Sequence, residues 1–423
     1  MTTIITAADA AQFLSYVPQL VGCTPTESLV LVPLSRDRSM GAMRFDLPAK
    51  EDTTAADDTV ERFASTVLGM VCRLAEATAF TAVVYTAAQF DETGRMPHRE
   101  LLEALAVRAD SAGLRVTDLL CVAADGWASA CDHDGQVGVR ALEEISSRED
   151  AAPGQPLGDQ TSGADLPEIE PAELEHVERA LTSMRTVFRV LAGAHDDEVE
   201  GPGWDDAASA RDVGDARDAD DAGHARDVGD ADDDLRSGEL RIDPQAIAAI
   251  ARIDDVPELY EKALGWTGRE GGAYDIAILG WCLSRPSMRD VALVQWSGDF
   301  DDGDDALDAQ LRWESGEEYP THLAMRMWGE GPQPDPARLM RALEVTKRVA
   351  ASMPRAMQAG SLAMCAWLSW ALGRSTHAEI YASRACEIEP EHGLSEIVRS
   401  FVGAGHLPEW AFHSARTRAT GSC

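Results

Sequence analysis

An acidic, low-complexity tract at residues 195–240 is the feature that most constrains how this chain can fold. It consists mainly of Asp, Ala, Gly and a few Arg, and the hexapeptide Arg-Asp-Val-Gly-Asp-Ala begins in it at both Arg211 and Arg226. Such residues bury too little apolar surface to offset the entropy that ordering them would cost. We therefore expect a disordered acidic insertion between two folded regions, with protease cleavage falling first between Ala194 and Gly238. Ca²⁺ chelation and mimicry of nucleic acid are the alternatives, although the fixed ligand spacing of an EF-hand is missing from the tract.

On the N-terminal side, residues 1–145 have the pattern of an α/β domain. An apolar helix is expected from Ala7, with Pro18 kinking or ending it before Gly22. Alternating and continuous apolar runs then predict a β-hairpin, a helix, a strand, a second helix and a second strand. This order is typical of a compact sheet covered by helices. The expected elements span residues 28–47 (the hairpin), 57–74, 81–85, 97–112 and 116–123.

The remainder of the chain is predicted to be mainly helical. Residues 146–170 are rich in Pro, Gly, Asp and Ser and are typical of a linker. Residues 171–194 form one amphipathic helix with a continuous apolar stripe, which favours burial in a core over a coiled coil. Beyond the acidic insertion, residues 241–410 predict a helical domain, and residues 411–423 a tail.

A helix pair at residues 360–403 has a repeat-like pattern. From Gly360 to Pro390 it is similar to one tetratricopeptide-type unit, with Ala366 at a close helix crossing and small residues on the second helix. The match is partial, because Ala382 stands where such units usually carry a large aromatic residue. No second copy follows at a spacing of about 34 residues. The pattern therefore favours one helical hairpin within a larger domain over a peptide-binding solenoid.

Charge and cysteine content indicate in which cellular compartment the protein works and which classes of partner are disfavoured. The formal net charge is −36, a field that disfavours nucleic acid and anionic membrane surfaces as partners. The eight cysteines are scattered without a Cys-x-x-Cys pair, and most have apolar neighbours, as buried free thiols do. We expect neither a signal peptide nor a membrane span, since the first residues lack a basic region and no long apolar run occurs. The sequence thus predicts a cytoplasmic protein.

No standard catalytic or cofactor signature occurs in the sequence. The phosphate loop, the dinucleotide fingerprint, the His-Glu-x-x-His motif and the Gly-x-Ser-x-Gly elbow are all missing. We therefore predict no catalytic residue, no cofactor and no metal ligand. Ligands of open α/β sheets collect beyond the carboxyl ends of strands, which makes a crevice there the one candidate site. Its candidate residues are Tyr85, Thr86, Asp91, Asp125 and Trp127, although ordinary loop polarity and a packed Trp are the favoured explanation for them.

A second local cluster lies at Cys131-Asp-His133-Asp. A thiolate, an imidazole and carboxylates are able to bind a transition metal. Side chains this close in sequence point at one ion only if the loop wraps around it, so a surface turn is the favoured interpretation. Whether Cys131 and His133 bind a metal is left open.

Several blocks resemble an actinobacterial family known as domain of unknown function 4192 (DUF4192). At the N-terminal end they are Val17-Pro-Gln-Leu-Val-Gly22, Ser28-Leu-Val-Leu-Val32 and Arg44-Phe-Asp-Leu-Pro48, followed by Val83-Val-Tyr85 and the stretch from Asp118 to Trp127. At the C-terminal end they are Ala366-Trp-Leu-Ser-Trp-Ala-Leu-Gly373, Ala385-Cys-Glu-Ile-Glu-Pro390 and Gly405-His-Leu-Pro408. The acidic middle departs from the family pattern. The resemblance implies a shared architecture and no reaction.

Two functional hypotheses follow. The first is a cytoplasmic, non-enzymatic binding or accessory protein with a protein partner, because two well-patterned folding units occur without a catalytic signature. The second is a small-molecule enzyme or sensor that uses the crevice at the strand ends. A ligand that raises the melting temperature, with the effect lost in Asp125→Ala, would favour the second hypothesis.

Overall fold

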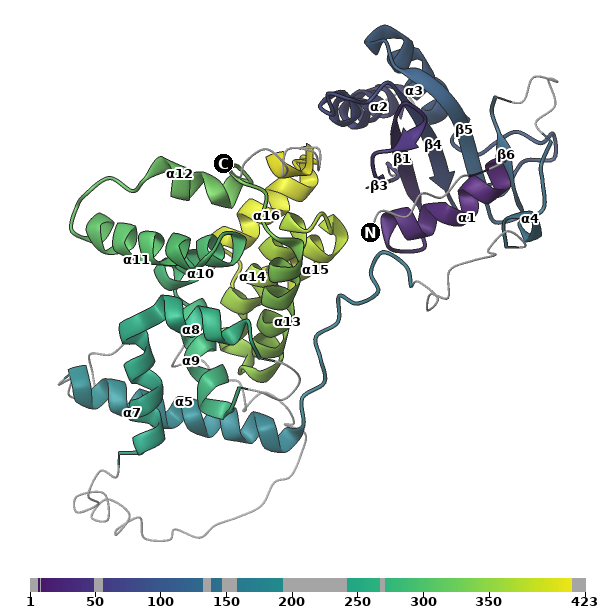
Figure 1. Cartoon of the computed structure of the whole chain (residues 1–423). Coiled ribbons are helices and arrows are strands. Elements are labelled where there is room, and N and C mark those ends of the chain that lie inside the picture. Colours follow the sequence, from purple (N-terminus) through teal and green to yellow (C-terminus); the bar gives the residue numbers. More distant parts are fainter. Residues whose placement is uncertain are drawn as a thin grey trace, which may run out of the picture. The chain divides into compact units, whose positions relative to one another are not determined.

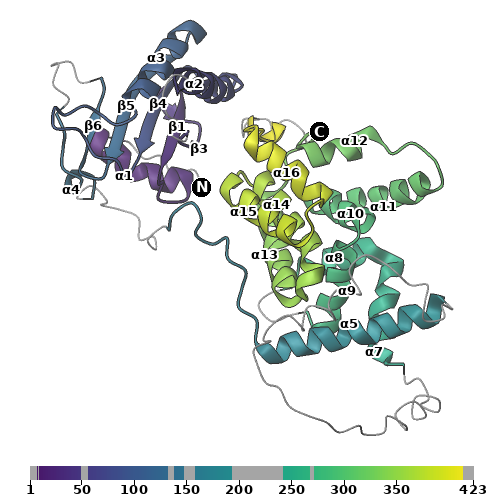
Figure 2. The ribbon, with the colours of Figure 1, turned by 180° about the vertical axis from the view of Figure 1, so that it is seen from behind.

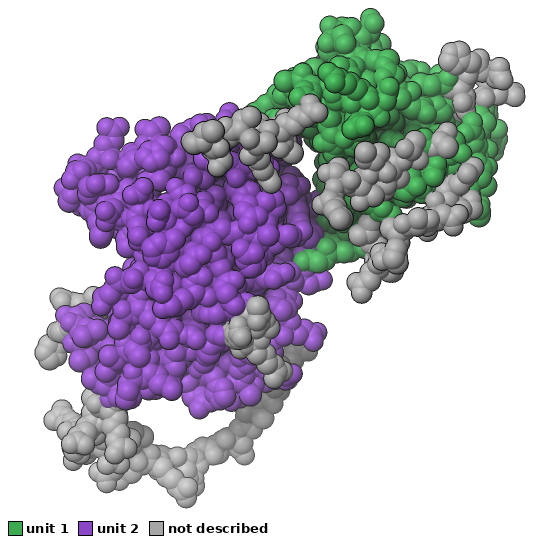
Figure 3. All heavy atoms as spheres, viewed as in Figure 1, with its two compact units in different colours: residues 1–163, 412–423 green, residues 164–411 purple. Residues whose placement is uncertain are grey.

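The computed structural model describes residues 7, 9–48, 56–131, 138–146, 158–192, 242–266 and 271–412. The chain forms two compact units, residues 1–163 with 412–423 and residues 164–411 (Figure 3). The first is an α/β unit and the second is helical, as the sequence predicted. The acidic insertion at residues 195–240 and nearly all of the tail at 411–423 lie outside the described residues.

A six-stranded mixed sheet forms the centre of the α/β unit (Figure 1). Its order is β2-β1-β4-β5-β6, and β3 also pairs with β1. Strand β1 is antiparallel to β2, β3 and β4, whereas β4 and β5 run parallel and β5 and β6 form an antiparallel hairpin. The strands are β1 (Ser28–Ser35), β2 (Arg38–Ser39), β3 (Met43–Asp46), β4 (Ala79–Tyr85), β5 (Arg115–Ala123) and β6 (Gly126–Ser129).

Helices cover both faces of this sheet, which explains why β1 and β4 are apolar at almost every position (Figures 1 and 2). Side chains alternate between the faces along each strand. Leu29 and Leu31 join the core under α2 (Ala56–Cys72) and α3 (Arg99–Ala112). Val30 and Val32 join the core under α1 (Ala10–Val21) and the segment that leads into α4 (Glu143–Ser146).

Capping residues explain where helix α1 begins and where the turn after it starts. Asp9 caps the helix, because its Oδ1 accepts a hydrogen bond from Gln12 N at 2.8 Å. The helix runs through Pro18 to Val21, so of the two expected effects, a kink or an end, Pro18 does not end it. Gly22 ends it instead, with a φ of +85° and its N–H donated to Pro18 O at 2.8 Å.

The helical unit encloses one large core that includes five buried tryptophans. Helix α5 belongs to this core, and its Phe188 stacks on Trp281 with ring centroids 4.7 Å apart. Among the described helices, none has the length and apolar character needed to cross a membrane. The helices are α5 (Pro171–Ala192), α7 (Pro244–Ile250), η1 (Ala251–Asp255), α8 (Val256–Ala263), α9 (Ala273–Leu283), α10 (Pro286–Ser297), α11 (Phe300–Glu314), α12 (Thr321–Ala324), η2 (Met325–Trp328), α13 (Pro336–Ser352), η3 (Arg355–Met357), α14 (Gln358–Ala371), α15 (Ser375–Ile388), α16 (Gly393–Gly403) and η4 (Glu409–Phe412).

Helix α14 lies at the centre of the unit and is buried at every position from Ala359 to Ala371. Its start crosses the end of α9 so closely that a Cβ on Gly360 would lie 2.2 Å from Leu283 O. Helices α13, α15 and α16 pack around it (Figure 1). Of the segment at residues 360–403, which the sequence pattern singled out, α14 therefore forms the interior of the helical unit, and α15 and α16 pack against it.

Candidate functional site

The predicted crevice lies where the parallel strands β4 and β5 both end. Thr86, the first residue after β4, donates its N–H to Val122 O at 3.0 Å. The loops that follow the two strands are joined as well, since Ala124 N donates to Ala88 O at 3.0 Å. Strand β1 begins at the same edge, with Ser28 opposite Tyr85. The polar side chains of three chain segments are thereby brought to one edge of the sheet.

Thr86 is held at this edge by Glu27, which the sequence analysis did not single out. The hydroxyl of Thr86 lies 3.2 Å from both carboxylate oxygens of Glu27, and Ala87 N donates to Glu27 Oε1 at 2.5 Å. Glu27 has a φ of +42°, in the left-handed region that is costly for a residue with a Cβ. The carboxylate that fastens the loop after β4 is thus presented by a strained turn.

The two candidate aspartates also hold backbone in place. Asp91 Oδ1 accepts hydrogen bonds from Thr93 Oγ1 at 2.7 Å, Thr93 N at 2.9 Å and Arg95 N at 2.7 Å. These bonds, the one from the Thr93 hydroxyl above all, lower the pKa of Asp91 below its ordinary value. Asp125 Oδ1 accepts from Phe90 N at 3.1 Å and so ties the β5–β6 turn to the loop after β4. Both carboxylates stabilise loops at this edge.

Tyr85 and Trp127 lie in the core beneath the loops. They stand on either side of Val122 in one row across β4, β5 and β6, and both belong to the cluster under α1. Tyr85 is 9% exposed and Trp127 is fully buried. Within the described residues neither the Tyr85 hydroxyl nor Trp127 Nε1 has a hydrogen-bond partner, and burial raises the pKa of Tyr85. The five candidate residues therefore separate into two core side chains and three on loops.

The turn at Cys23–Glu27 is clasped by a segment that is distant in the sequence. Thr24 N donates to Gly158 O at 2.8 Å, and Gln160 accepts from Thr26 N and donates to Thr26 O. Burial raises the pKa of the Cys23 thiol, although the nearby Arg44 acts in the opposite direction. A thiol with a raised pKa is a poor nucleophile at neutral pH, as expected for a structural residue.

The possible metal place at Cys131 is only partly within the described residues. Cys131 lies in the turn that follows strand β6, whereas His133 and both neighbouring aspartates lie outside the described residues. Among residues that the structure describes, no group of three or more His, Cys, Asp or Glu side chains is placed to hold a metal ion.

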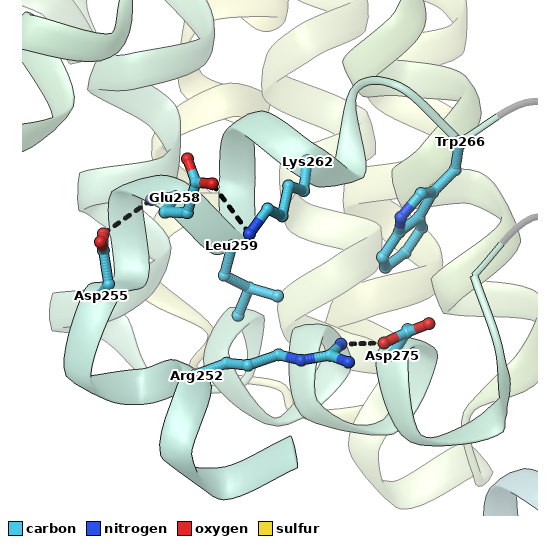
Figure 4. Close-up of a pocket in the computed structure, with 7 residues that line it drawn as sticks. All are labelled: Arg252, Asp255, Glu258, Leu259, Lys262, Trp266 and Asp275. Atoms are coloured by element: carbon cyan, nitrogen blue, oxygen red, sulfur yellow. Dashed lines mark hydrogen bonds and ion pairs between the residues drawn. The ribbon is translucent and has the colours of Figure 1, made fainter. Parts of the chain in front are cut away.

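The helical unit carries a pocket that the sequence analysis missed. We call it the Trp266 pocket; it has a volume of about 460 Å³ and opens between η1, α8 and the start of α9 (Figure 4). It is lined by Arg252, Asp255, Glu258, Leu259, Lys262, Trp266 and Asp275. Two cations, three carboxylates and two apolar side chains therefore share one small surface.

Two ion pairs shape this pocket. Lys262 Nζ lies 2.8 Å from Glu258 Oε1 along α8. Arg252 pairs with Asp275, whose other carboxylate oxygen accepts from Gly272 N at 2.8 Å and completes the cap of α9. Asp255 caps α8, because its Oδ1 accepts from Glu258 N at 3.0 Å. Helix capping thus fixes the position of two of the three carboxylates.

Trp266 is supported from behind by a glycine. A Cβ on Gly271 would lie 2.9 Å from the indole ring, and the residue has a φ of +87°. Glycine is the residue that meets both conditions at little cost. The sequence offered two signals for this place, one of only three lysines in the chain at Lys262 and the Gly271-Gly272 pair after Trp266. Neither signal indicates a pocket without knowledge of the fold.

The C-terminal blocks that carry the family resemblance meet in a second cluster. Trp370 Nε1 donates to His406 O at 2.8 Å, and the two rings stack with centroids 5.9 Å apart. Gly329 lies against both segments, since a Cβ there would be 2.6 Å from Pro408 and 2.7 Å from Trp370. Trp410 Nε1 donates to Ala371 O at 3.3 Å. Trp370, His406 and Trp410, which we call the aromatic clasp, thus fasten the C-terminal end of the helical unit to α14.

Comparison with known proteins gives one match. The family model described as "Domain of unknown function (DUF4192)" matches residues 11–409 of the chain. No curated protein matches it. No solved structure matches it either.

Proposed function

The chain belongs to the DUF4192 family of unknown function, and from that premise we propose that it is a non-enzymatic binding or accessory protein that acts through a protein partner. The main support is two exposed apolar side chains on α11. Leu311 is 58% exposed and Trp313 is 55% exposed, near the end of a helix whose Gly303, Ala306 and Ala309 are buried. Tryptophan is enriched among the residues that contribute most to binding at protein interfaces.

The strand-end edge of the α/β unit supports the same proposal. The candidate side chains there hold loops, as with Asp125 and Phe90 N, or fill the core, as with Trp127. Side chains used in this way serve to shape a surface.

A cytoplasmic location and an actinobacterial source belong to this proposal. The seven described cysteines are free thiols, and Cys121, Cys282 and Cys365 are fully buried, which supports a reducing compartment. The net charge of −36 supports a partner other than nucleic acid or an anionic membrane.

Affinity purification from the native host tests the proposal. The full chain should recover a reproducible protein partner, and the double variant Leu311→Ala/Trp313→Ala should lose it while keeping its melting temperature. Val107→Ala is the matched control, because Val107 is 65% exposed on the α/β unit and its truncation should leave recovery unchanged. Equal recovery by the double variant would show that α11 is not the interface, and no partner with the native chain would refute the binding role.

The second candidate function is the small-molecule enzyme or sensor at the strand ends. One observation favours it: the hydroxyl of Tyr85 and the indole N–H of Trp127 are buried polar groups in one row of the sheet and lack partners among the described residues. Buried unpaired polar groups are rare and sometimes mark functional places. A metabolite that raises the melting temperature of the native chain, but not of Asp125→Ala, would favour this function over the first.

A further inference from the structure

The Trp266 pocket is charged on two opposite sides and apolar between them (Figure 4). On one side is the Lys262–Glu258 pair of α8, and on the other is the Arg252–Asp275 pair. Leu259 and the Trp266 ring lie between the two pairs in Figure 4. A ligand in this space meets a cation, a carboxylate and an apolar side chain at once.

The two ion pairs are open to solvent and can exchange partners. The side chains of Lys262 and Glu258 are 67% and 43% exposed, and that of Arg252 is 46% exposed. Exposed ion pairs contribute little to stability in water, so opening them costs little. A ligand carboxylate can then contact the cation of one pair, while the ligand ammonium contacts the carboxylate which that cation releases. Each charge keeps a partner of opposite sign throughout.

A ligand with only one charge fits the lining less well. A simple cation can contact only the carboxylates, and a simple anion can contact only Arg252 and Lys262. A ligand that carries both signs makes charge-assisted hydrogen bonds to groups of both kinds. The alternation of charges in the lining therefore favours a ligand that carries both signs.

The apolar part of the pocket selects the rest of the ligand. Leu259 is only 3% exposed, and the Trp266 ring rests against Gly271 on one side. A ring held in this way can stack on an apolar or aromatic group without being ordered first. The volume of about 460 Å³ falls within the range of roughly 300–1,000 Å³ that is typical of small-molecule sites.

We propose that the Trp266 pocket binds a free α-amino acid with an apolar or aromatic side chain. Its carboxylate contacts Lys262, its ammonium contacts Glu258, and its side chain packs on Trp266 and Leu259. This small-molecule site goes beyond the protein partner proposed above and does not depend on the surface of α11.

Isothermal titration of the full chain at pH 7.5, where the amino acid carries both charges, tests the ligand class. The probes are L-phenylalanine, phenethylamine, which lacks the carboxylate, and 3-phenylpropanoate, which lacks the ammonium. We expect L-phenylalanine to bind and each single-charge analogue to bind at least about tenfold more weakly, because each loses charge-assisted hydrogen bonds. Equal binding of either analogue, or no binding of L-phenylalanine, would overturn the proposal.

Variants locate the site. Lys262→Gln, at an exposed position, should weaken L-phenylalanine binding about tenfold without changing the fold, and Trp266→Ala should remove the quenching of indole fluorescence by the ligand. Arg312→Gln and Trp313→Ala are the matched controls on α11 and should leave binding unchanged. Unchanged affinity in Lys262→Gln would place any binding elsewhere and overturn the proposal. Loss of the protein partner in the α11 double variant, with amino-acid binding retained, would show that the two proposals are separate.

Discussion

Mild acid should destabilise the helical unit through one buried histidine, His392. Its side chain precedes α16, is 5% exposed, and has Arg289 Nη1 3.3 Å from Nε2 and Ser395 Oγ 3.1 Å from Nδ1. Arginine can only donate hydrogen bonds, so Nε2 acts as the acceptor and the ring is neutral. Protonating Nε2 would bring two cations together inside the protein. Burial first, and the charge of Arg289 second, therefore lower the pKa of His392 to about 4.

The size and sign of the pH effect follow from this value. In the unfolded chain the ordinary pKa of His392 is 6.5, so the unfolded state takes up a proton that the folded state refuses until the pH nears 4. Above pH 6.5 the histidine is neutral in both states, so it does not lower the free energy of unfolding. As the pH falls from 6.5 toward 4, the unfolded chain binds a proton that the folded chain does not, and stability is lost. At about 1.4 kcal/mol per pH unit, the largest loss in the free energy of unfolding through His392 is about 3 kcal/mol. A loss of about 2 kcal/mol is expected at pH 5.

Urea unfolding at pH 7 and pH 5, followed by tryptophan fluorescence, measures this loss. His392→Asn provides a side chain suited to a helix start and removes the titrating group. Between the two pH values the native chain should lose about 2 kcal/mol more than this variant, since other groups, including the partly buried Asp290 beside Arg289, titrate in both. His322→Asn, at an exposed histidine on α12, should behave like the native chain. Equal pH dependence in the native chain and His392→Asn would refute the reasoning.

Four further predictions test the packing of the two units. Gly360→Ala should destabilise the helical unit by about 2–3 kcal/mol in urea unfolding, because the new methyl group would meet Leu283 O; the same substitution at Gly403, which has open space, should cost nothing or stabilise slightly. Trp370→Phe should cost about 2 kcal/mol, since it removes the donor to His406 O and part of the aromatic clasp; an unchanged urea midpoint would contradict that role. Asp125→Ala should cost about 1 kcal/mol and speed hydrogen exchange at Phe90 N, and unaltered exchange there would show that the bond is unimportant. Limited proteolysis should cut first between Ala194 and Gly238, and earlier cleavage within α14 would count against the predicted domain organisation.

The elements that periodicity specifies strongly could be predicted from the sequence. Strand β4 is buried at all seven positions, so its run of apolar residues was unambiguous. The same holds for α14, which the sequence showed to be apolar nearly all round and which is buried on all sides. The sequence was less informative where one residue could act in two ways. Pro18 could end α1 or lie within it, and it lies within the helix, which ends at Gly22.

The candidate site was harder to predict because it depends on contacts between distant segments. Topology correctly indicates that Thr86 and Asp125 come to the same edge, since both follow strands that run parallel. It does not indicate that Glu27 would reach Thr86 from a turn with a positive φ, because backbone conformation at one residue has no sequence pattern. The Trp266 pocket joins side chains from η1, α8 and α9, and its charges looked like an ordinary solvated surface before the fold was known.

The blocks that carry the family resemblance are used to build the protein. Gly22 of the first block ends α1, and the C-terminal blocks meet where Trp370 and Pro408 both lie against Gly329. Side chains committed to such contacts cannot also present themselves to a ligand without breaking the fold. Residues outside these blocks, among them Lys262 and Trp266 in the pocket and Trp313 on α11, retain exposed surface. Function should therefore respond to substitutions at these exposed positions, whereas substitutions within the blocks should act first on stability.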